Sequence, residues 1–553
     1  MNDSGTQTGP SRPLWWLAAI WLGLGLFRVA LNGLLGFPFI FDDELEYWLY
    51  AHQLLSGQWV FHYAGAITHY PAYVYPLFVS LVLRLSSSLH TQYLLVRTVD
   101  AFVISTVVFP VYRFGVDLGL GERRALWAAL MSGLVSGADY ASTIMAENLF
   151  YPLSLVILYL LWRSGRDPRP GRSLLLGLLT GVGILLKPQG LFFIPLGLVV
   201  AVMALASTRD PRRIATGALA YALGLVPILS TRLVIARAEG YRHLFTLHAF
   251  MGFYRAQSGV HREPPAGLEA HYAAAYAVIL LLVGALLPLV AIFGPRRIRD
   301  RGFWTITILA TVGLVLYFSR NTVLYNLLGV GGAHGGRQAR AQERYLFEVL
   351  PLWFLAAGAQ FGRGLRSFRA WGLVLGLAGA TVALAAVWLP DFFGQLVTFD
   401  APGLTGYYWL SLQHPALILP ALILLSLLGL STLLTRRPYG AMVALVAMCL
   451  TWYPGIDATT SLTNAQAAAP LVPWIRAQVP SGDILGWDQS TVNSGIMHTV
   501  EFWRVKPWRG LESPRATGAE ACRTWVLTRP STPPASGTRQ LDGYALLPPP
   551  CRS

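Results

Sequence analysis

The chain has 553 residues, of which 54% are hydrophobic and only 12% are charged, and its mean hydropathy is +0.50. Soluble globular proteins carry roughly 25% charged residues, so this composition excludes a single soluble core and indicates a membrane protein. The net charge of +15 does not indicate nucleic acid, because many of the arginines stand in short clusters between apolar runs instead of forming one basic face.

Apolar runs that can cross a membrane follow one another along most of the chain. A span takes roughly 20 apolar residues. Thirteen helices are predicted, at 14–35, 92–114, 126–144, 147–162, 173–187, 189–206, 215–236, 272–293, 303–319, 346–362, 371–389, 413–434 and 439–453. Lys187 and Pro188 separate two of these runs, which form either a hairpin or one broken helix.

Arginine clusters precede the first run and follow every second one. They are Arg12, then Arg123 and Arg124, then Arg163, Arg166, Arg169 and Arg172, then Arg212 and Arg213, then Arg296, Arg297, Arg299 and Arg301, then Arg363, Arg366 and Arg369, and finally Arg436 and Arg437. Cytoplasmic loops carry an excess of basic residues, so these connections and the N-terminus are predicted to be cytoplasmic. The chain is therefore expected to be a multi-pass protein of the cell inner (plasma) membrane.

The remaining connections are longer and rich in aromatic, histidine and carboxylate side chains. They are 36–91, 237–271, 320–345 and 390–412. With an odd number of spans, the C-terminal tail also lies outside the cytoplasm. We therefore divide the chain into a transmembrane domain, 1–453, and an extracytoplasmic domain, 454–553.

The tail has the composition of a small folded domain. A helix is predicted at 471–478, and short apolar or strand-like runs at 483–487 and 524–527, separated by Pro and Gly. This pattern favours a small α/β domain. Cys522 and Cys551 lie in this tail, where a compartment outside the cytosol permits a disulfide between them.

The chain leaves the first span as GFPFIFDDELEYW, which places Asp42, Asp43, Glu44 and Glu46 close to the membrane surface. One interpretation is that these acids only cap a helix, because the macrodipole stabilises negative charge at a helix start. The other is catalytic. An amphipathic stretch and an aromatic run follow, and they would hold the carboxylates at the membrane for general-base chemistry on a lipid-linked substrate.

This arrangement resembles the first outer loop of the GT-C glycosyltransferases, in the branch of protein O-mannosyltransferases and lipid A aminoarabinose transferases. The acid pair of that branch matches Asp43 and Glu44, and Asp42 is an additional acid. Three later segments resemble the same branch in the same order. They are MAENLFYPLSLVILYLL with Glu147, LLTGVGILLKPQGLFFIPL with Lys187 and Pro188, and ERYLFEVLPLWFL with Arg344 and Tyr345.

The resemblance implies an all-α polytopic GT-C-like fold and an inverting transfer. A sugar would pass from a polyprenyl-phosphate-linked donor to a glycan, lipid or protein acceptor on the outer face. Asp43 would be the general base, with Glu44 or Asp42 orienting it. Glu147 is either a helix cap or a second acid near the acceptor, since an acid close to the bilayer is a functional candidate.

The lipid phosphate would leave with negative charge, so cations near the membrane would stabilise it. Lys187 and Arg344 are the candidates, beside Tyr345. Arg340, with His334 and Arg337, lies in the Gly-rich loop GVGGAHGGRQARAQERY, which is suited to closing over substrate. In the alternative interpretation, Lys187 snorkels to the interface and Arg344 pairs with a neighbouring glutamate.

Other polar residues have simpler interpretations. Arg97 and Asp100, inside the second run, are predicted to be buried polar packing or a mutual pair. His52, His62 and His69 share the acid-bearing loop but lack the spacing of a zinc site, and DDELE lacks the alternating ligands of an EF-hand. We therefore predict no cofactor and no required metal, although acidic loops can hold a divalent cation.

Two other classes of protein share some of these features. An O-antigen-type polymerase or ligase would use arginine and histidine in a late outer loop such as 320–345, but it leaves the early acid cluster unexplained. A transporter would show internal repeats with polar residues at mid-membrane. The sequence shows no such repeat, and its polar residues gather at the outer face. The expected partners are the lipid-linked donor, the acceptor and the bilayer, with no nucleic acid.

Overall fold

The structure is a computed structural model, and it describes only part of the chain. The described residues are 12–34, 42–63, 66–68, 72–135, 140–208, 210–242, 266–293, 298, 300–323, 346–360, 368–393, 410, 414–435, 437–457, 470–479, 484–488, 509–511, 524–528, 539–541 and 544–547.

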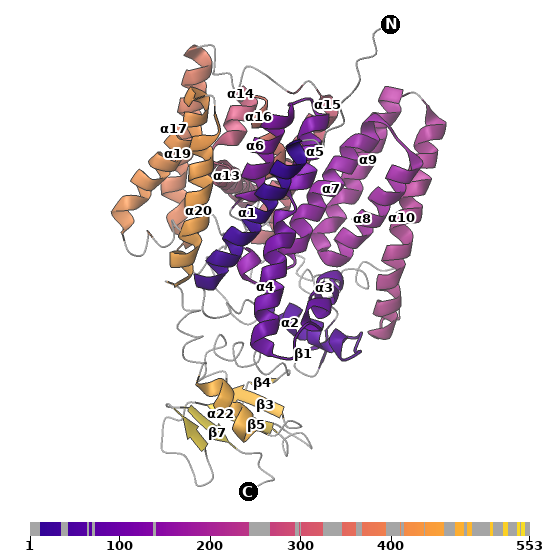
Figure 1. Ribbon diagram of the computed structural model, residues 1–553, viewed down its shortest axis with the longest axis vertical. Helices are drawn as coiled ribbons and strands as arrows, with labels where there is room; N and C mark the ends of the chain where they lie inside the picture. Colours follow the sequence, from indigo (N-terminus) through magenta and orange to yellow (C-terminus); the bar gives the residue numbers. More distant parts are fainter. Residues whose placement is uncertain are drawn as a thin grey trace.

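Apolar helices form one bundle, with a small sheet at one end of it (Figure 1). The bundle helices are α1 (Arg12–Leu34), α4 (Leu89–Ser105), α5 (Val108–Asp117), α6 (Glu122–Gly133), α7 (Glu147–Arg166), α8 (Pro170–Leu186), α9 (Phe193–Thr208), α10 (Pro211–Ala238), α13 (Ala266–Val283), α14 (Leu287–Phe293), α15 (Arg301–Thr322), α16 (Leu350–Gly358), α17 (Phe368–Phe393), α19 (Ile418–Thr435) and α20 (Tyr439–Asp457).

Within the described residues, six helices are long and apolar enough to cross a membrane, or seven if the bent pair α13 and α14 is one span. The chain is thus a multi-pass membrane protein, as the composition predicts. Each of the thirteen predicted runs contains helix, but α6 has only 12 residues and α16 only 9. The count of thirteen spans stays a prediction.

Two predicted helices are interrupted. Within the run 126–144, α6 ends at Gly133, whose carbonyl oxygen accepts a hydrogen bond from the Arg28 guanidinium of α1, and residues 140–142 form a 3₁₀ turn. The run 272–293 bends by 96° between α13 and α14. Ala285 and Leu286 take positive φ angles of 48° and 56° at this bend.

The break at Lys187 makes a hairpin. Lys187 is extended (φ −157°, ψ 132°), and a 3₁₀ turn, η2 (Pro188–Phe192), leads into α9. Phe150 contacts Phe193, and Gly165 lies close to Val200, so α9 runs parallel to α7. Because α8 returns antiparallel to α7 after a short turn, α8 and α9 are two separate, antiparallel helices (Figure 1).

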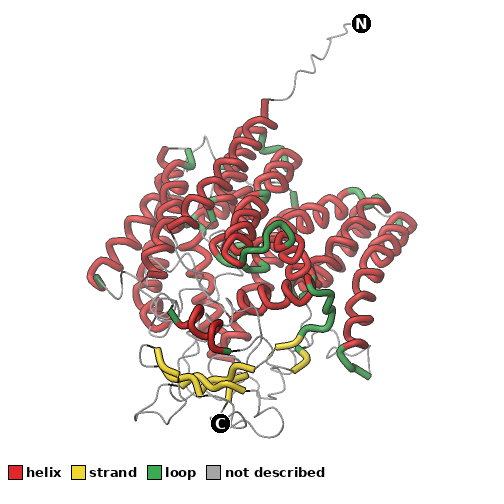
Figure 2. Tube along the Cα trace, turned by 60° about the horizontal axis from the view of Figure 1, so that its bottom comes forward, coloured by secondary structure: helices red, strands yellow, loops and turns green. Residues whose placement is uncertain are grey.

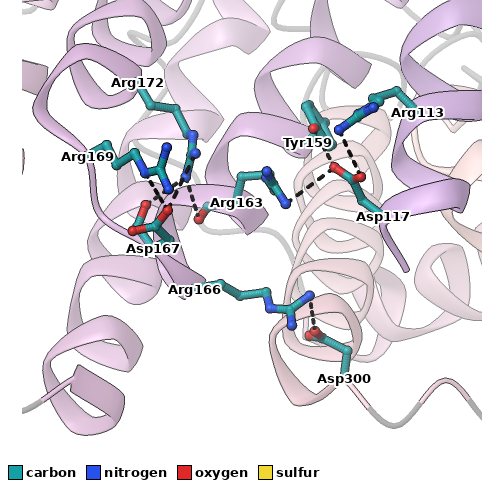
Figure 3. A network of polar contacts seen from close by, with 9 residues as sticks. All are labelled: Arg113, Asp117, Tyr159, Arg163, Arg166, Asp167, Arg169, Arg172 and Asp300. Carbon is teal, nitrogen blue, oxygen red and sulfur yellow. Dashed lines mark hydrogen bonds and ion pairs between the residues drawn. The ribbon is translucent and has the colours of Figure 1, made fainter. Parts of the chain in front are cut away.

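One end of the bundle collects arginines, and we call it the arginine end. Asp117, the last residue of α5, pairs with Arg163 of α7 at 3.4 Å and accepts a hydrogen bond from Tyr159 at 2.7 Å (Figure 3). Arg166 pairs with Asp300 at the start of α15, at 3.5 Å. Connections predicted to lie on one side of the membrane therefore meet in the structure.

The opposite end, which we call the α2 end, carries the segment after the first span. It consists of α2 (Asp42–Leu55), a hairpin of β1 (His62–Tyr63) and β2 (Ala66–Ile67), and α3 (Val74–Leu83). The tail lies beyond this end (Figure 2). It contains α22 (Leu471–Gln478), β3 (Ile484–Asp488), β4 (Arg509–Leu511), β5 (Thr524–Thr528), β6 (Arg539–Leu541) and β7 (Tyr544–Leu547).

The five strands of the tail form a mixed sheet in the order β4-β3-β5-β7-β6. β3 is parallel to β4 and β5, whereas β7 is antiparallel to both of its neighbours. Leu471 and Ile475 of α22 pack against Leu485, Leu527 and Leu546 of the sheet. The predicted helix of the tail is therefore present, the strand-like run 524–527 is a strand, and the short apolar run 483–487 also contains a strand.

Glycines bring α8 and α10 unusually close. A Cβ on Gly177 of α8 would overlap the carbonyl oxygen of Tyr221, and one on Gly224 of α10 would overlap that of Leu174. Small residues that allow backbones to touch are a common means of packing helices in membranes. This contact sets the position of α10, whose far end lies at the α2 end of the bundle.

We expect Gly177→Ala to destabilise the protein, because the added methyl group must push α10 away from α8. Overpacking of this kind costs roughly 1–3 kcal/mol. The matched control is Gly376→Ala in α17, where a Cβ meets nothing within 4 Å. Thermal unfolding in detergent should show a lower midpoint for Gly177→Ala alone. Equal midpoints for both variants would contradict the close packing.

Candidate functional site

The acid cluster begins α2, and its members differ in environment. Glu44 is fully buried, and its Oε1 accepts a hydrogen bond from the backbone N–H of Ile144 at 2.9 Å. Asp43 is partly exposed. Asp42 is the first residue of the helix, but its side chain lies outside the described part. Glu44 is thus part of the buried packing. Of the predicted pair Asp43 and Glu44, only Asp43 is accessible.

Three stacked aromatic rings hold α2 in place. Tyr50 of α2 stacks on Phe61 with centroids 4.4 Å apart, and Phe61 stacks on Tyr73, also at 4.4 Å. The Gln53 amide donates to the His62 carbonyl at 2.7 Å and accepts from the His62 N–H at 2.8 Å. The acid-bearing helix is therefore fixed to the segment that follows it.

A buried ion pair at the end of α10 is hydrogen-bonded to this stack. Arg232 and Glu239 are both fully buried, with Nη1 and Oε2 2.9 Å apart. The Tyr73 hydroxyl donates to Glu239 Oε1 at 2.8 Å. Burial raises the pKa of Tyr73, and the Glu239 charge raises it further. The hydroxyl therefore keeps its proton and stays a donor to Glu239 at neutral pH.

The pair leaves part of the Arg232 guanidinium unused. Its Nε and Nη2 are buried and have no hydrogen-bond partner in the structure. These two nitrogens form the side-on edge of the guanidinium, which matches two oxygens of a carboxylate or phosphate. Sequence reasoning missed Arg232, although an arginine inside the apolar run 215–236 is a functional signal in itself.

Lys187 points into the bundle, toward an acid. Its Nζ lies 2.6 Å from Glu147 Oε1, and the two side chains expose only 7% and 1% of their surface. Glu348, also buried, is attracted by the Lys187 charge and repelled by the Glu147 charge. The structure thus brings together two predicted site residues, Glu147 and Lys187. It places this pair in the interior, and the role of Lys187 as a phosphate ligand stays a prediction.

The two polar residues of the second span have separate partners. Arg97 donates to the Asn32 carbonyl at 2.9 Å and lies over the Tyr93 ring. Asp100 accepts from Tyr75 at 2.6 Å and from Asn148 at 3.0 Å. The expectation of buried polar packing is met, and no ion pair joins Arg97 to Asp100 among the described residues.

Several predicted residues lie outside the described part of the chain. They are the donor-binding candidates His334, Arg337, Arg340, Arg344 and Tyr345, together with His69, Cys522 and Cys551. In the part that is described, no three histidine, cysteine or carboxylate side chains gather as metal ligands. The absence of a required metal stays a prediction.

Comparison with known proteins relies on structure. No family model matches this sequence, and no curated protein is significantly similar to it. ArnT from Cupriavidus metallidurans bound to undecaprenyl phosphate is similar with a TM-score of 0.56 and 16% identity, over 90% of this chain and 86% of that chain. The oligosaccharyltransferase of Archaeoglobus fulgidus in its apo form is similar with a TM-score of 0.51 and 10% identity, over 95% of this chain and 70% of that chain.

These likenesses show the fold. The chain has the GT-C fold of ArnT and the archaeal oligosaccharyltransferase, which are both glycosyltransferases. The all-α polytopic GT-C-like fold predicted from four sequence segments is therefore confirmed. The likeness to ArnT, at 16% identity, is one of fold.

His52 makes the stability of the α2 region depend on pH. Its ring lies 4.7 Å from that of Trp48, and burial lowers the pKa of His52 from 6.5 to about 4. Between these values the unfolded chain binds a proton that the folded chain does not, so stability falls as the pH falls from about 6.5 to about 4.

We expect His52→Phe to lose less stability than the unsubstituted protein when the pH is lowered from 7 to 4.5, because it removes this proton uptake. The readout is the unfolding midpoint at several pH values. His90→Gln, at an exposed position, is the control and should leave the pH dependence unchanged. The same slope for His52→Phe and the unsubstituted protein would show that His52 titrates normally.

Proposed function

We propose that this protein is a membrane glycosyltransferase that transfers a sugar, with inversion, from a polyprenyl-phosphate-linked donor to an acceptor. One observation carries the proposal. Within a fold shared with ArnT, an accessible carboxylate, Asp43, and a buried guanidinium with an unused bidentate edge, Arg232, lie in elements joined at the same end of the bundle. The solved ArnT holds undecaprenyl phosphate, which is the class of lipid that such an arrangement suits.

We infer that the α2 end lies outside the cytoplasm, in the cell inner membrane. The support is the collection of arginines at the opposite end, which the positive-inside rule assigns to the cytoplasm. The N-terminus would then be cytoplasmic and the tail sheet extracytoplasmic. This orientation places the α2 end where a lipid-linked sugar meets acceptors of the cell envelope: a glycan, a lipid or a protein.

The proposed chemistry is a single displacement. Asp43 takes the proton of the acceptor hydroxyl while that oxygen forms a bond to the anomeric carbon of the donor. The bond from the anomeric carbon to the phosphate oxygen breaks, and its electron pair leaves with the polyprenyl phosphate. Glu44 is unsuited to the proton transfer, because it is fully buried and bonded to Ile144. Its proposed role is to orient the start of α2.

The leaving phosphate needs positive charge, and the side-on edge of Arg232 can supply two hydrogen bonds to it. Arg232 is connected to α2 through Glu239, Tyr73 and the aromatic stack. Asp43 precedes the stacked Tyr50 by seven residues, which is about 10 Å along a helix. We retain the other predicted donor-binding residues as proposals: Arg340, Arg344, Tyr345 and His334.

We expect Asp43→Asn to lower the transfer rate by roughly 10²–10⁴-fold, the usual contribution of a general base. The measurement is the release of polyprenyl phosphate by purified protein, from a panel of polyprenyl-phosphate-linked sugars with envelope extracts as acceptors. Glu46→Gln, in the same turn of α2, is the matched control and should stay active. An active Asp43→Asn protein would remove the base assignment, and an unsubstituted protein inactive on all donors would overturn the proposed function.

We expect Arg232→Lys to weaken binding of undecaprenyl phosphate by roughly 10- to 100-fold, because lysine keeps the charge beside Glu239 but lacks the side-on edge. Direct binding to protein in nanodiscs is the measurement. Arg237→Lys, at an exposed position near the end of the same helix, is the control. Unchanged affinity in Arg232→Lys would exclude this guanidinium as the phosphate ligand.

A further inference from the structure

Part of the connection between α6 and α7 is buried in the interior and contains a 3₁₀ turn at 140–142. Residues 140–148, which end in the first two residues of α7, each expose 2% or less of their surface; we call them the 140–148 segment. Loops usually lie at the surface, because their backbone polar groups need water. The backbone groups of a buried loop must therefore form hydrogen bonds with side chains in place of water. These bonds also hold those side chains in position.

Side chains from two other elements bond to the backbone of this segment. Asn32, near the end of α1, donates to the Ala141 carbonyl at 2.9 Å. Glu44 of α2 accepts from the Ile144 N–H, also at 2.9 Å. The first acid-bearing turn of α2 is thus attached to the segment by the side chain next to Asp43.

Asn148 stabilises the segment from within and connects it to α4. Its Nδ2 lies 3.0 Å from the carbonyl oxygens of Tyr140 and Thr143 and from Asp100 Oδ2. Asp100 also accepts from Tyr75 of α3 at 2.6 Å. These bonds close the segment into a compact turn that cannot shift without breaking buried hydrogen bonds.

The remaining anchor is ionic. Glu147 pairs with Lys187 at 2.6 Å, and Lys187 lies at the break between α8 and η2. The Lys187 Nζ also lies 6.0 Å from the centre of the Phe150 ring, in a largely apolar setting. A buried charge without its partner is strongly unfavourable, so this pair holds the start of α7 to α8.

We propose that the 140–148 segment positions the proposed base, and that Lys187 is a positioning residue acting through Glu147. The line of contacts runs from Lys187 to Glu147, along the segment to Ile144, and through Glu44 to Asp43. This inference rests on the proposed function. It gives Lys187 a role that differs from that of a phosphate ligand, and the two roles predict different kinetics.

We expect Glu147→Gln and Lys187→Met each to lower kcat by roughly tenfold or more, with a donor KM unchanged within about twofold, because a displaced base slows chemistry but leaves donor binding intact. Lys187→Met should be the more severe, since it leaves the buried Glu147 carboxylate without its cationic partner. The double variant should be no worse than Lys187→Met, because both changes remove one contact.

The control is Tyr159→Phe, which removes a bond to Asp117 at the arginine end and should leave kcat unchanged. If Lys187 binds the phosphate, Lys187→Met raises the donor KM while Glu147→Gln does not. That result would overturn the proposal. A strictly additive double variant would overturn it as well.

Hydrogen exchange separates this inference from the proposed function, since it needs no substrate. Faster exchange in the first turn of α2 is expected in Glu147→Gln and Lys187→Met, but not in Tyr159→Phe. Faster exchange in a protein that transfers no sugar would support the positioning role and overturn the function. If the protein transfers sugar but exchange and kcat are unchanged in both variants, the proposed function is supported and the positioning role is overturned.

Discussion

The hydrogen bond from the Ile144 N–H to the Glu44 carboxylate joins the part of the molecule that carries the proposed chemistry to the part that supports it. Water is excluded from both atoms, so breaking the bond would leave a buried polar group unsatisfied, at a cost of about 1–3 kcal/mol. The bond exists only if the 140–148 segment is itself held in place. The contacts of Asn32, Asn148 and Lys187 with that segment are therefore requirements of the same constraint.

Two ion pairs at the α2 end are buried. One buried ion pair joins two helices, Glu147 of α7 with Lys187 at the end of α8, and the other, Arg232 with Glu239, lies within the last turns of α10 and is bonded to Tyr73. Such pairs contribute little net stability, because desolvation offsets their attraction, but losing one partner is costly. Such pairs therefore favour the one arrangement of the chain in which both partners meet. In Arg232, the guanidinium nitrogens Nε and Nη2 are buried without a hydrogen-bond partner, and these are the two that we propose to bind the lipid phosphate.

The arginine end is built differently. Its pairs, such as Arg113 with Asp117 and Arg169 with Asp167, involve arginines that are 60% and 71% exposed. Exposed pairs are worth less than about 1 kcal/mol and are screened by salt. Figure 3 shows them as a band across the ends of several helices. In the proposed orientation these arginines face the cytoplasm, whereas the few buried pairs at the α2 end lie beside the proposed site.

The sequence by itself determined those properties that depend on local composition. Hydropathy located the helices, arginine spacing grouped the connections at one end, and the run of acids marked α2. The short apolar run 483–487 and the strand-like run 524–527 marked two strands of the tail sheet. Each of these signals is read along the chain, from local composition or from the positions of the arginines, so no knowledge of distant contacts was needed.

Only the tertiary structure decided which polar groups are paired. Glu44 and Ile144 are 100 residues apart, Asn32 and Ala141 are 109 apart, and Glu147 and Lys187 are 40 apart. No periodicity relates such positions. The burial of the 140–148 segment, the partner of Lys187 and the unused edge of Arg232 all follow from which helices meet at the α2 end. Burial makes each of these groups depend on a partner, and the fold alone supplies that partner.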